Sequence, residues 1–441
     1  MSTTTAATRL GRDLSAICGA EYVIEAPTES ILGVCPAVAV QPGSADEVAA
    51  LLRFANEHKL SVVPAGGMTH QHTGHRPPQV DVLLYTSRLT DVEHYDPGDL
   101  TIGVGAGWTV GQLAAKVAAD KLFFAGDPSS PERATVGGLL ATGLYGPHRH
   151  GYGGLRDYCI GVRFVTGDAR KAKGGGRVVK NVAGYDMMKL LIGSWGTLGI
   201  ITSASFKLFP APRQTQTLVS CFPTAAEALE FRSRILHSPL DPICLELLSP
   251  RASAVLTPNS PAAALWSVCL RAAGSDAVLA RYRAELGSAL THEIRTGNEE
   301  GFWSAVANFA PAVRQQHPDC LLISLMLPLA DVAPALDSAA AVAESAGLEL
   351  AAIGRVGVGH LLIALWPAAN VGAESLNFVK AVAGLRGVLP RDGCMTVLQS
   401  PEGARSEVNP WAAIPTDIKS MRAVKSALDP NDILNRGRLP L

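Results

Sequence analysis

The chain has 441 residues, which is enough for two or three domains, because a single hydrophobic core stops growing at roughly 250–300 residues. Its formal net charge is −1, so there is no basic excess to neutralise a phosphate backbone, and this argues against nucleic acid as a partner. The eight cysteines are scattered and form no CxxC pair, which argues against a zinc ribbon or an iron–sulfur cluster in this chain.

The N-terminal segment, residues 1–36, has no apolar core of the kind found in a signal peptide. No window of the sequence approaches the ~18–20 continuous apolar residues of a membrane span. We therefore expect a cytoplasmic protein, which would be peripheral at the inner face of the membrane only through partners.

A first domain is predicted over residues 37–210. It opens with a short strand, a helix, a second strand and a glycine turn, in the order of a βαβ-like unit. Ser44 is a good N-cap for the helix, because Glu47 follows three residues later and completes a capping box. Further strands follow, and Thr109 is expected to cap another helix that begins near residue 110.

Beyond Pro210 the pattern changes. Alanine-rich helical stretches such as AAEALEFRSRIL alternate with apolar strands such as HLLIALWP, which predicts an α+β second domain over residues 211–400. A C-terminal segment, residues 401–441, then contains one more helix, which stops at Asp429-Pro430 before a polar tail.

Glycine-rich turns in the first domain suggest a phosphate-bearing cofactor. The turn at residues 64–69, PAGGMT, directly follows an apolar strand. Successive backbone N–H groups in such a turn can hold a pyrophosphate without lysines, and Gly66 and Gly67 can adopt positive φ and leave no side chain in the way. Taken alone, the motif is more often an ordinary turn.

Two later motifs strengthen this interpretation. Residues 135–143, TVGGLLATG, combine small residues with hydroxyls at both ends, which could wrap phosphate and ribitol oxygens. The alternative is a tightly packed helix start. Residues 193–199, GSWGTLG, form a turn that leads into an apolar strand at Ile200, whose backbone could pair with the polar edge of adenine.

These motifs carry a family resemblance. Residues 37–210 resemble the PCMH-type FAD-binding domain of the vanillyl-alcohol oxidase and D-lactate dehydrogenase superfamily. The stretches VQPGSADEVAALLRFANEH, KNVAGYDMMKLLIGSWGTLGIIT and NPWAAIPTDIKSMRAVKSALDPNDILNRGRL are similar, more narrowly, to the FAD-binding subunit of bacterial glycolate oxidase.

The resemblance implies an α+β fold: an FAD-binding domain of two α+β subdomains, then an α+β cap domain, then a C-terminal helix that returns to the FAD domain. FAD would be noncovalent, because Met68 stands where some members tether the flavin to a histidine. The implied cofactor-binding residues are Pro64, Ala65, Gly66, Gly67, Met68, Thr69, Pro128, Thr135, Gly137, Gly138, Ala141, Thr142, Gly143, Gly199 and Ile200.

The likeness also implies a departure at the catalytic site. Catalytic D-2-hydroxyacid dehydrogenases of the superfamily carry HAGDGNLH and EHGIG motifs that bind a divalent metal. The counterpart that the resemblance implies here is RVGVGHLL, in which Arg355 and Leu362 replace both histidines, and no EHG follows. We therefore expect no metal site. His360 is interpreted as structural.

The resulting hypothesis is an FAD-binding subunit of a glycolate oxidase-type complex, which oxidises glycolate to glyoxylate with a catalytic flavoprotein subunit and an iron–sulfur subunit. Asn181, Tyr185 and Arg355 are the candidate catalytic residues. One alternative is a self-contained oxidoreductase for a small 2-hydroxy acid or alcohol, with Lys180 and His360 as further candidates. The other is a noncatalytic assembly subunit that keeps the flavin fold.

Overall fold

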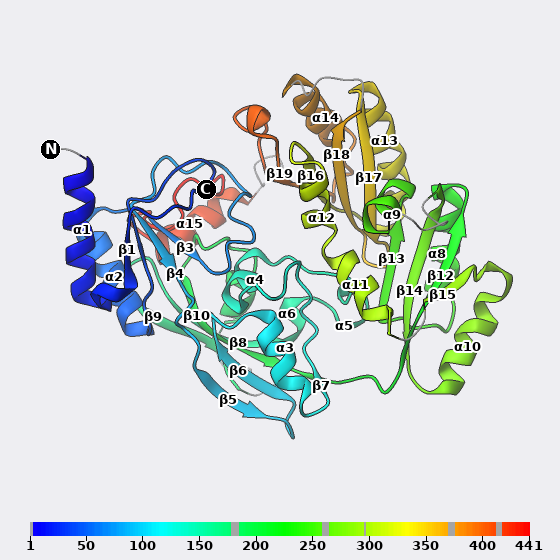
Figure 1. Cartoon of the computed structure of the whole chain (residues 1–441), viewed down its shortest axis with the longest axis horizontal. Helices are drawn as coiled ribbons and strands as arrows, with labels where there is room; N and C mark the ends of the chain where they lie inside the picture. The colour runs from blue at the N-terminus through cyan, green and yellow to red at the C-terminus, as the bar shows by residue number, and fades with distance from the viewer. Residues whose placement is uncertain (1–2, 178–184, 258–263, 295–296, 369–374, 412–416) are drawn as a thin grey trace. The chain divides into compact units, whose positions relative to one another are not determined.

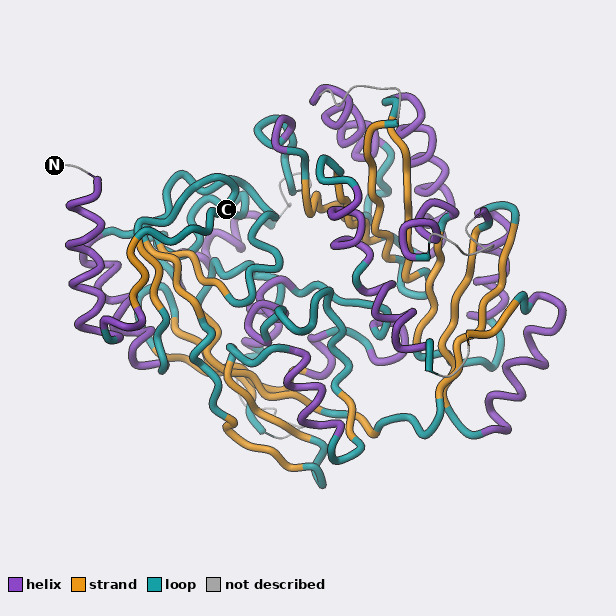
Figure 2. Tube along the Cα trace, in the orientation of Figure 1, coloured by secondary structure: helices purple, strands orange, loops and turns teal. Residues whose placement is uncertain are grey.

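The computed structural model describes residues 3–177, 185–257, 264–294, 297–368, 375–411 and 417–441 (Figure 1). They form two compact units. Unit 1 comprises residues 1–145, 154–211 and 413–441, and unit 2 comprises residues 146–153 and 212–412. Both units mix helices and sheets, which confirms the predicted α+β class (Figure 2).

Unit 1 contains two main sheets. The first has the strand order β1-β2-β4-β3, in which β2, β4 and β3 are parallel and β1 is antiparallel to β2. The second has the order β5-β6-β10-β8-β9 and is antiparallel. The strands are β1 (Val23–Glu25), β2 (Val38–Val40), β3 (Val62–Ala65), β4 (Val82–Tyr85), β5 (Val92–Asp96), β6 (Thr101–Gly105), β7 (Leu122–Phe123), β8 (Cys159–Val165), β9 (Lys171–Gly175), β10 (Ile200–Lys207) and β11 (Phe209–Pro210).

Two helices of unit 1 begin at the caps that the sequence predicts. The hydroxyl of Ser44 accepts from the backbone N–H of Glu47, and Thr109 forms a full capping box with Gln112, so both predicted caps are confirmed. The predicted capping box at Ser44 is wrong, because the Glu47 carboxylate accepts from the N–H of Gly43 instead. The helices are α1 (Thr3–Cys18), α2 (Ala45–His58), α3 (Val110–Ala118), α4 (Val136–Thr142), α6 (Leu155–Tyr158), α7 (Met187–Leu191) and α15 (Ile418–Leu428).

The N-terminal segment is an integral part of unit 1. Leu14 and Cys18 of α1 are buried in the same core as strands β2 and β3 and helix α2, because the apolar side of α1 has no other surface to cover. The predicted boundary at residue 37 therefore does not separate two structural parts.

Unit 2 is built on one antiparallel sheet. Among the described residues its strand order is β15-β12-β14-β13-β17-β18-β16-β19. The strands are β12 (Thr215–Phe222), β13 (Cys244–Leu248), β14 (Trp266–Ala273), β15 (His292–Ile294), β16 (Leu321–Met326), β17 (Leu348–Arg355), β18 (His360–Pro367) and β19 (Cys394–Gln399).

Helices α8, α10, α13 and α14 share the core of unit 2 with one face of this sheet. Alternate residues along each strand point to that core, and the residues between them point to the opposite face. The helices of the unit are α5 (Arg149–Tyr152), α8 (Ala225–Leu236), α9 (Pro250–Leu256), α10 (Asp276–Leu286), α11 (Glu299–Ala307), α12 (Phe309–Gln316), α13 (Val332–Ser345) and α14 (Ser375–Gly387).

Two predicted boundaries differ from the structure. Residues 146–153 interrupt unit 1 and pack in unit 2, where the N–H of Gly151 donates to the carbonyl of Ile243. Residues 401–412 also belong to unit 2, because Trp411 pairs with Thr396 of β19 and Val408 is buried in the unit's core. Among the described residues, the chain is back in unit 1 from residue 417, and not from residue 401.

Candidate functional site

Unit 1 contains a cavity that encloses about 690 Å³ of space, part of it open to solvent. It lies where the end of β3, helix α4, the turn before β10 and the C-terminal tail come together. The lining residues are Pro64, Ala65, Gly66, Gly67, Met68, Thr69, His70, Gln71, Thr86, Thr135, Gly137, Gly138, Ala141, Thr142, Trp195, Gly196, Gly199, Ile200, Ile201, Asn435 and Arg438.

The glycine turn after β3 forms one wall of this cavity. A Cβ on Gly66 would lie 2.0 Å from Thr135 Oγ1, and one on Gly67 would lie 1.7 Å from the carbonyl oxygen of Arg133. Both glycines are therefore required by close packing. Neither glycine uses the positive φ that its lack of a side chain allows, and the left-handed residue of the turn is Met68, with φ of 59°.

The backbone amides of this turn face no acceptor of the protein itself. Among the described residues, the N–H groups of residues 66–69 donate no hydrogen bond. Four successive amides without an internal partner at the wall of a cavity form a backbone site for an anion. The amides of this turn are thus available to a ligand in the cavity.

Helix α4 contributes differently. Its first amides are already occupied: the N–H groups of Val136 and Gly137 donate to the carbonyls of Trp108 and Ala106, and that of Gly138 to the Thr135 hydroxyl. The start of this helix is therefore tightly packed, as the alternative interpretation of the TVGG motif held. What it offers to the cavity is a small-residue surface and the hydroxyls of Thr135 and Thr142.

The cavity gathers most of the predicted cofactor-binding residues. Pro128 and Gly143 are the two that do not line it. Pro128 is buried elsewhere, and Gly143 is the left-handed C-cap that ends α4, with φ of 66°. Gly143 therefore shapes the helix that borders the cavity without forming its wall.

Several lining residues were not predicted, and the most consequential come from the C-terminal tail. Arg438 is buried, and its Nη2 donates to the carbonyl of His70 (3.1 Å) and to Oε1 of Gln71 (3.3 Å). Burial lowers the pKa of Arg438 to about 10, so its guanidinium stays charged at neutral pH. A fixed positive charge therefore lies beside the free amides of the glycine turn.

A second polar cluster lies in unit 2, on the sheet face opposite the core helices. It comprises Glu246 of β13, Ser324 of β16, Arg355 at the end of β17 and His360 at the start of β18. Glu246, Arg355 and His360 are all buried, and Arg355 Nε lies 3.6 Å from Glu246 Oε1. The sequence contains one signal of this cluster, the lone carboxylate in the apolar strand CLELL. A carboxylate buried in such a strand requires a cationic partner.

His360 is held between two partners. Its Nδ1 lies 3.0 Å from Arg355 Nη1, and its Nε2 lies 2.9 Å from the Ser324 hydroxyl. Because a guanidinium only donates, Nδ1 must accept and Nε2 must carry the proton. Burial, followed by the charges of Arg355 and Arg149, lowers the pKa of His360 well below its ordinary value, so the ring is neutral.

The predicted catalytic residues have different outcomes. Asn181 and Lys180 lie outside the described residues. Tyr185, in unit 1, is 90% exposed, and Arg355, in unit 2, is enclosed by its own partners. No group of three or more potential metal-ligating side chains occurs in the part of the chain that the structure describes.

Comparison with known proteins decides the family. Residues 36–172 match the model of an FAD binding domain, and residues 211–393 and 403–439 match that of the C-terminal domain of FAD linked oxidases. The chain belongs to the FAD-linked oxidase family. This FAD-linked oxidase is an FAD-dependent oxidoreductase of the GlcD and D-lactate dehydrogenase type.

Curated relatives of this FAD-linked oxidase act on hydroxy acids. It is 36% identical to the D-lactate dehydrogenase of Archaeoglobus fulgidus, over about half of each chain (49% and 48%). It is 25% identical to glycolate oxidase subunit GlcD of Bacillus subtilis, over 92% of this chain and 89% of the relative. It is 40% identical to glycolate oxidase subunit GlcE of Escherichia coli, over 29% of this chain and 37% of the relative.

Solved structures share the fold at low sequence identity. An alkyldihydroxyacetonephosphate synthase matches 98% of this chain and 86% of its own, with a TM-score of 0.72 at 18% identity. A 4-ethylphenol oxidase from Gulosibacter chungangensis matches 99% and 97%, with a TM-score of 0.71 at 16% identity. No described helix of the FAD-linked oxidase is long and apolar enough to cross a membrane.

Proposed function

We propose that this chain is the FAD-binding subunit of a glycolate oxidase-type complex, which oxidises glycolate or a close 2-hydroxy acid to the 2-oxo acid. Its partners would be a catalytic flavoprotein subunit and an iron–sulfur subunit, and any contact with a membrane would run through them. The similarity to subunits GlcD and GlcE supports this proposal. We place the complex in the cytoplasm or at the inner face of the membrane.

The unit 1 cavity suits FAD by the chemistry of its donors. FAD, when bound, supplies a two-electron acceptor for hydride from a substrate carbon. The amides of residues 66–69 and the Arg438 guanidinium complement its two phosphate charges. The side chain at the turn is the thioether of Met68, which is a poor nucleophile, so the chain would hold the cofactor without a covalent bond.

The partners of Arg355 are the observation on which we base the separate roles of this chain and the catalytic subunit. A substrate carboxylate needs an available cation, and the substrate hydroxyl needs a base. Arg355 is committed to Glu246 and His360, and both ring nitrogens of His360 are in hydrogen bonds. These residues therefore serve the fold of unit 2, and we assign substrate binding and proton removal to the catalytic partner.

A second candidate is a self-contained D-lactate or related hydroxyacid oxidoreductase. The 36% identity with the Archaeoglobus enzyme favours it, although that similarity spans half of either chain. In this alternative, the chain alone would bind the hydroxy acid and remove its proton.

Reconstitution tests the proposal. The chain would be produced alone and together with the catalytic flavoprotein and iron–sulfur subunits, and dye reduction would be measured with glycolate and with D-lactate. We expect a stable complex by size-exclusion chromatography, with turnover confined to it. Equal turnover per flavin by the isolated chain would favour the second candidate instead.

A further inference from the structure

Asn435 occupies a constrained position in the C-terminal tail. Its backbone lies in the left-handed region, with φ of 46°, which asparagine tolerates better than most residues. Its N–H donates to the carbonyl of Val62 in β3 (2.9 Å), and its Nδ2 donates to the carbonyl of Trp195 (2.6 Å). Because a carbonyl only accepts, the second bond fixes which end of the side-chain amide is Nδ2.

The other end of the amide has no partner in the protein. Asn435 Oδ1 is buried and makes no hydrogen bond to any described residue. The residue is only 4% exposed and lies between the unit 1 cavity, which it lines, and a second pocket beside Thr197 and Lys425. A buried acceptor without a partner is costly, so its presence in a cavity wall indicates a donor that arrives with a ligand.

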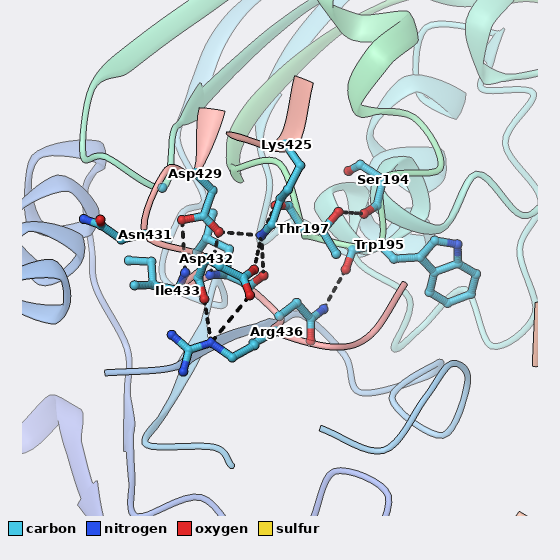
Figure 3. A network of polar contacts seen from close by, with 12 residues as sticks. Ser194, Trp195, Thr197, Lys425, Asp429, Asn431, Asp432, Ile433 and Arg436 are labelled. Carbon is cyan, nitrogen blue, oxygen red and sulfur yellow. Dashed lines mark hydrogen bonds and ion pairs between the residues drawn. The ribbon is translucent and has the colours of Figure 1, made fainter. Parts of the chain in front are cut away.

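The tail that carries Asn435 is itself firmly held. The ammonium of Lys425 in α15 lies at the centre of a polar network (Figure 3). It donates to the carbonyls of Thr197 (3.0 Å) and Leu434 (3.1 Å) and pairs with Asp429 (2.5 Å), whose carboxylate also accepts from the N–H groups of Ile433 and Leu434. One buried cation thus joins the turn before β10 to the tail.

We propose that Oδ1 of Asn435 accepts a hydrogen bond from bound FAD, so that the tail, residues 429–438, is part of the cofactor site. This inference rests on FAD occupying the unit 1 cavity. The ionised phosphates of FAD have no donor, so the donor is the imide N–H of the isoalloxazine, the amino group of adenine or a hydroxyl of ribitol or ribose. The network around Lys425 holds the acceptor in place before the cofactor binds.

Two substitutions separate the two ends of the amide. Asn435→Gly keeps the left-handed backbone and removes both Oδ1 and Nδ2, whereas Asn435→Asp keeps an acceptor but replaces the donor to Trp195 by a second oxygen and adds a negative charge. The dissociation constant would be measured from the free FAD fluorescence that appears when each holo-protein is diluted. We expect Asn435→Gly to weaken FAD binding roughly 5- to 15-fold and Asn435→Asp to weaken it less.

Competition of FMN and of ADP with FAD, measured for the wild type and for Asn435→Gly, would show which half of the cofactor carries the donor. A lower affinity of the variant for either fragment supports the proposal. Unchanged FAD affinity in Asn435→Gly would overturn it. So would equal weakening in both variants, because the contact with Trp195 would then explain the effect. Wild-type protein that retains no FAD would overturn the use of the cavity itself, and with it this inference.

Discussion

Arg355 and His360 face each other across the register of β17 and β18, and the guanidinium donates to Nδ1 of the imidazole over 3.0 Å. This bond, with the ion pair between Arg355 and Glu246, forms a polar cluster in a buried sheet face. Strand alternation puts all of these side chains on the side away from the core helices. Such a cluster is expected to stabilise unit 2 rather than to bind substrate.

Removing one member of the buried pair should therefore destabilise the protein. Glu246→Gln leaves the Arg355 cation without its counter-charge, and we expect a loss of about 3–5 kcal/mol in the free energy of unfolding, measured by urea denaturation. The double variant Glu246→Leu, Arg355→Met should recover much of that loss. If the single and double variants were equally unstable, the ion pair would not be the cause.

The pH dependence of stability should contain a contribution from His360. Its pKa is lowered in the folded state, so the unfolded chain binds the proton more readily. The contribution to stability is complete above the ordinary pKa of about 6.5 and is lost as pH falls below it. His360→Asn, which keeps an acceptor for Arg355, should lose less stability than the wild type between pH 7 and pH 5. Parallel stability curves would contradict this.

The glycine turn should tolerate no side chain at Gly67. A methyl group there meets the carbonyl of Arg133, so Gly67→Ala must displace the turn and its free amides. We expect at least a roughly tenfold weaker affinity for FAD, seen as loss of flavin absorbance on gel filtration. Gly301→Ala is the matched control, because its Cβ would meet nothing within 4 Å in helix α11 and should leave FAD bound.

Lys425 should contribute more to the stability of the protein than Arg436, which lies further along the C-terminal segment. Lys425→Met leaves the fully buried Asp429 carboxylate without its cation, at a cost of about 3–5 kcal/mol. Arg436 pairs at 3.7 Å with the half-exposed Asp432, so Arg436→Ala should cost about 0–1 kcal/mol. Thermal unfolding measures both, and similar effects of the two substitutions would rule out a special role for the Lys425 network.

Local features were predictable from the sequence because they depend on neighbouring residues. Ser44 and Thr109 cap helices as predicted, since a hydroxyl and the amides three residues later suffice. The turn at Gly66 and Gly67 was also predicted. The structure requires glycine at both positions because a side chain would not fit, and not because of a positive φ. Residue type alone does not decide capping: Asp186 precedes α7, but its side chain makes no cap hydrogen bond and pairs with Lys189.

Features that depend on tertiary contact were not predictable in the same way. Asn435 and Arg438 reach the cavity because the tail joins β3 through Val62, and nothing in the local sequence specifies that pairing. Residues 146–153 leave unit 1 for unit 2 for a similar reason, since the ring of His150 packs on the turn at Gly357. Long-range packing therefore determines the position of the C-terminal tail and that of residues 146–153.

The central claim is that this chain carries FAD while the chemistry on the hydroxy acid requires a partner. The most direct measurement is anaerobic mixing of the purified FAD-bound chain with excess glycolate or D-lactate, with the flavin absorbance recorded over time. We predict that the flavin of the isolated chain stays oxidised and becomes reduced when the catalytic flavoprotein subunit is added. Rapid bleaching of the flavin in the isolated chain would contradict the account.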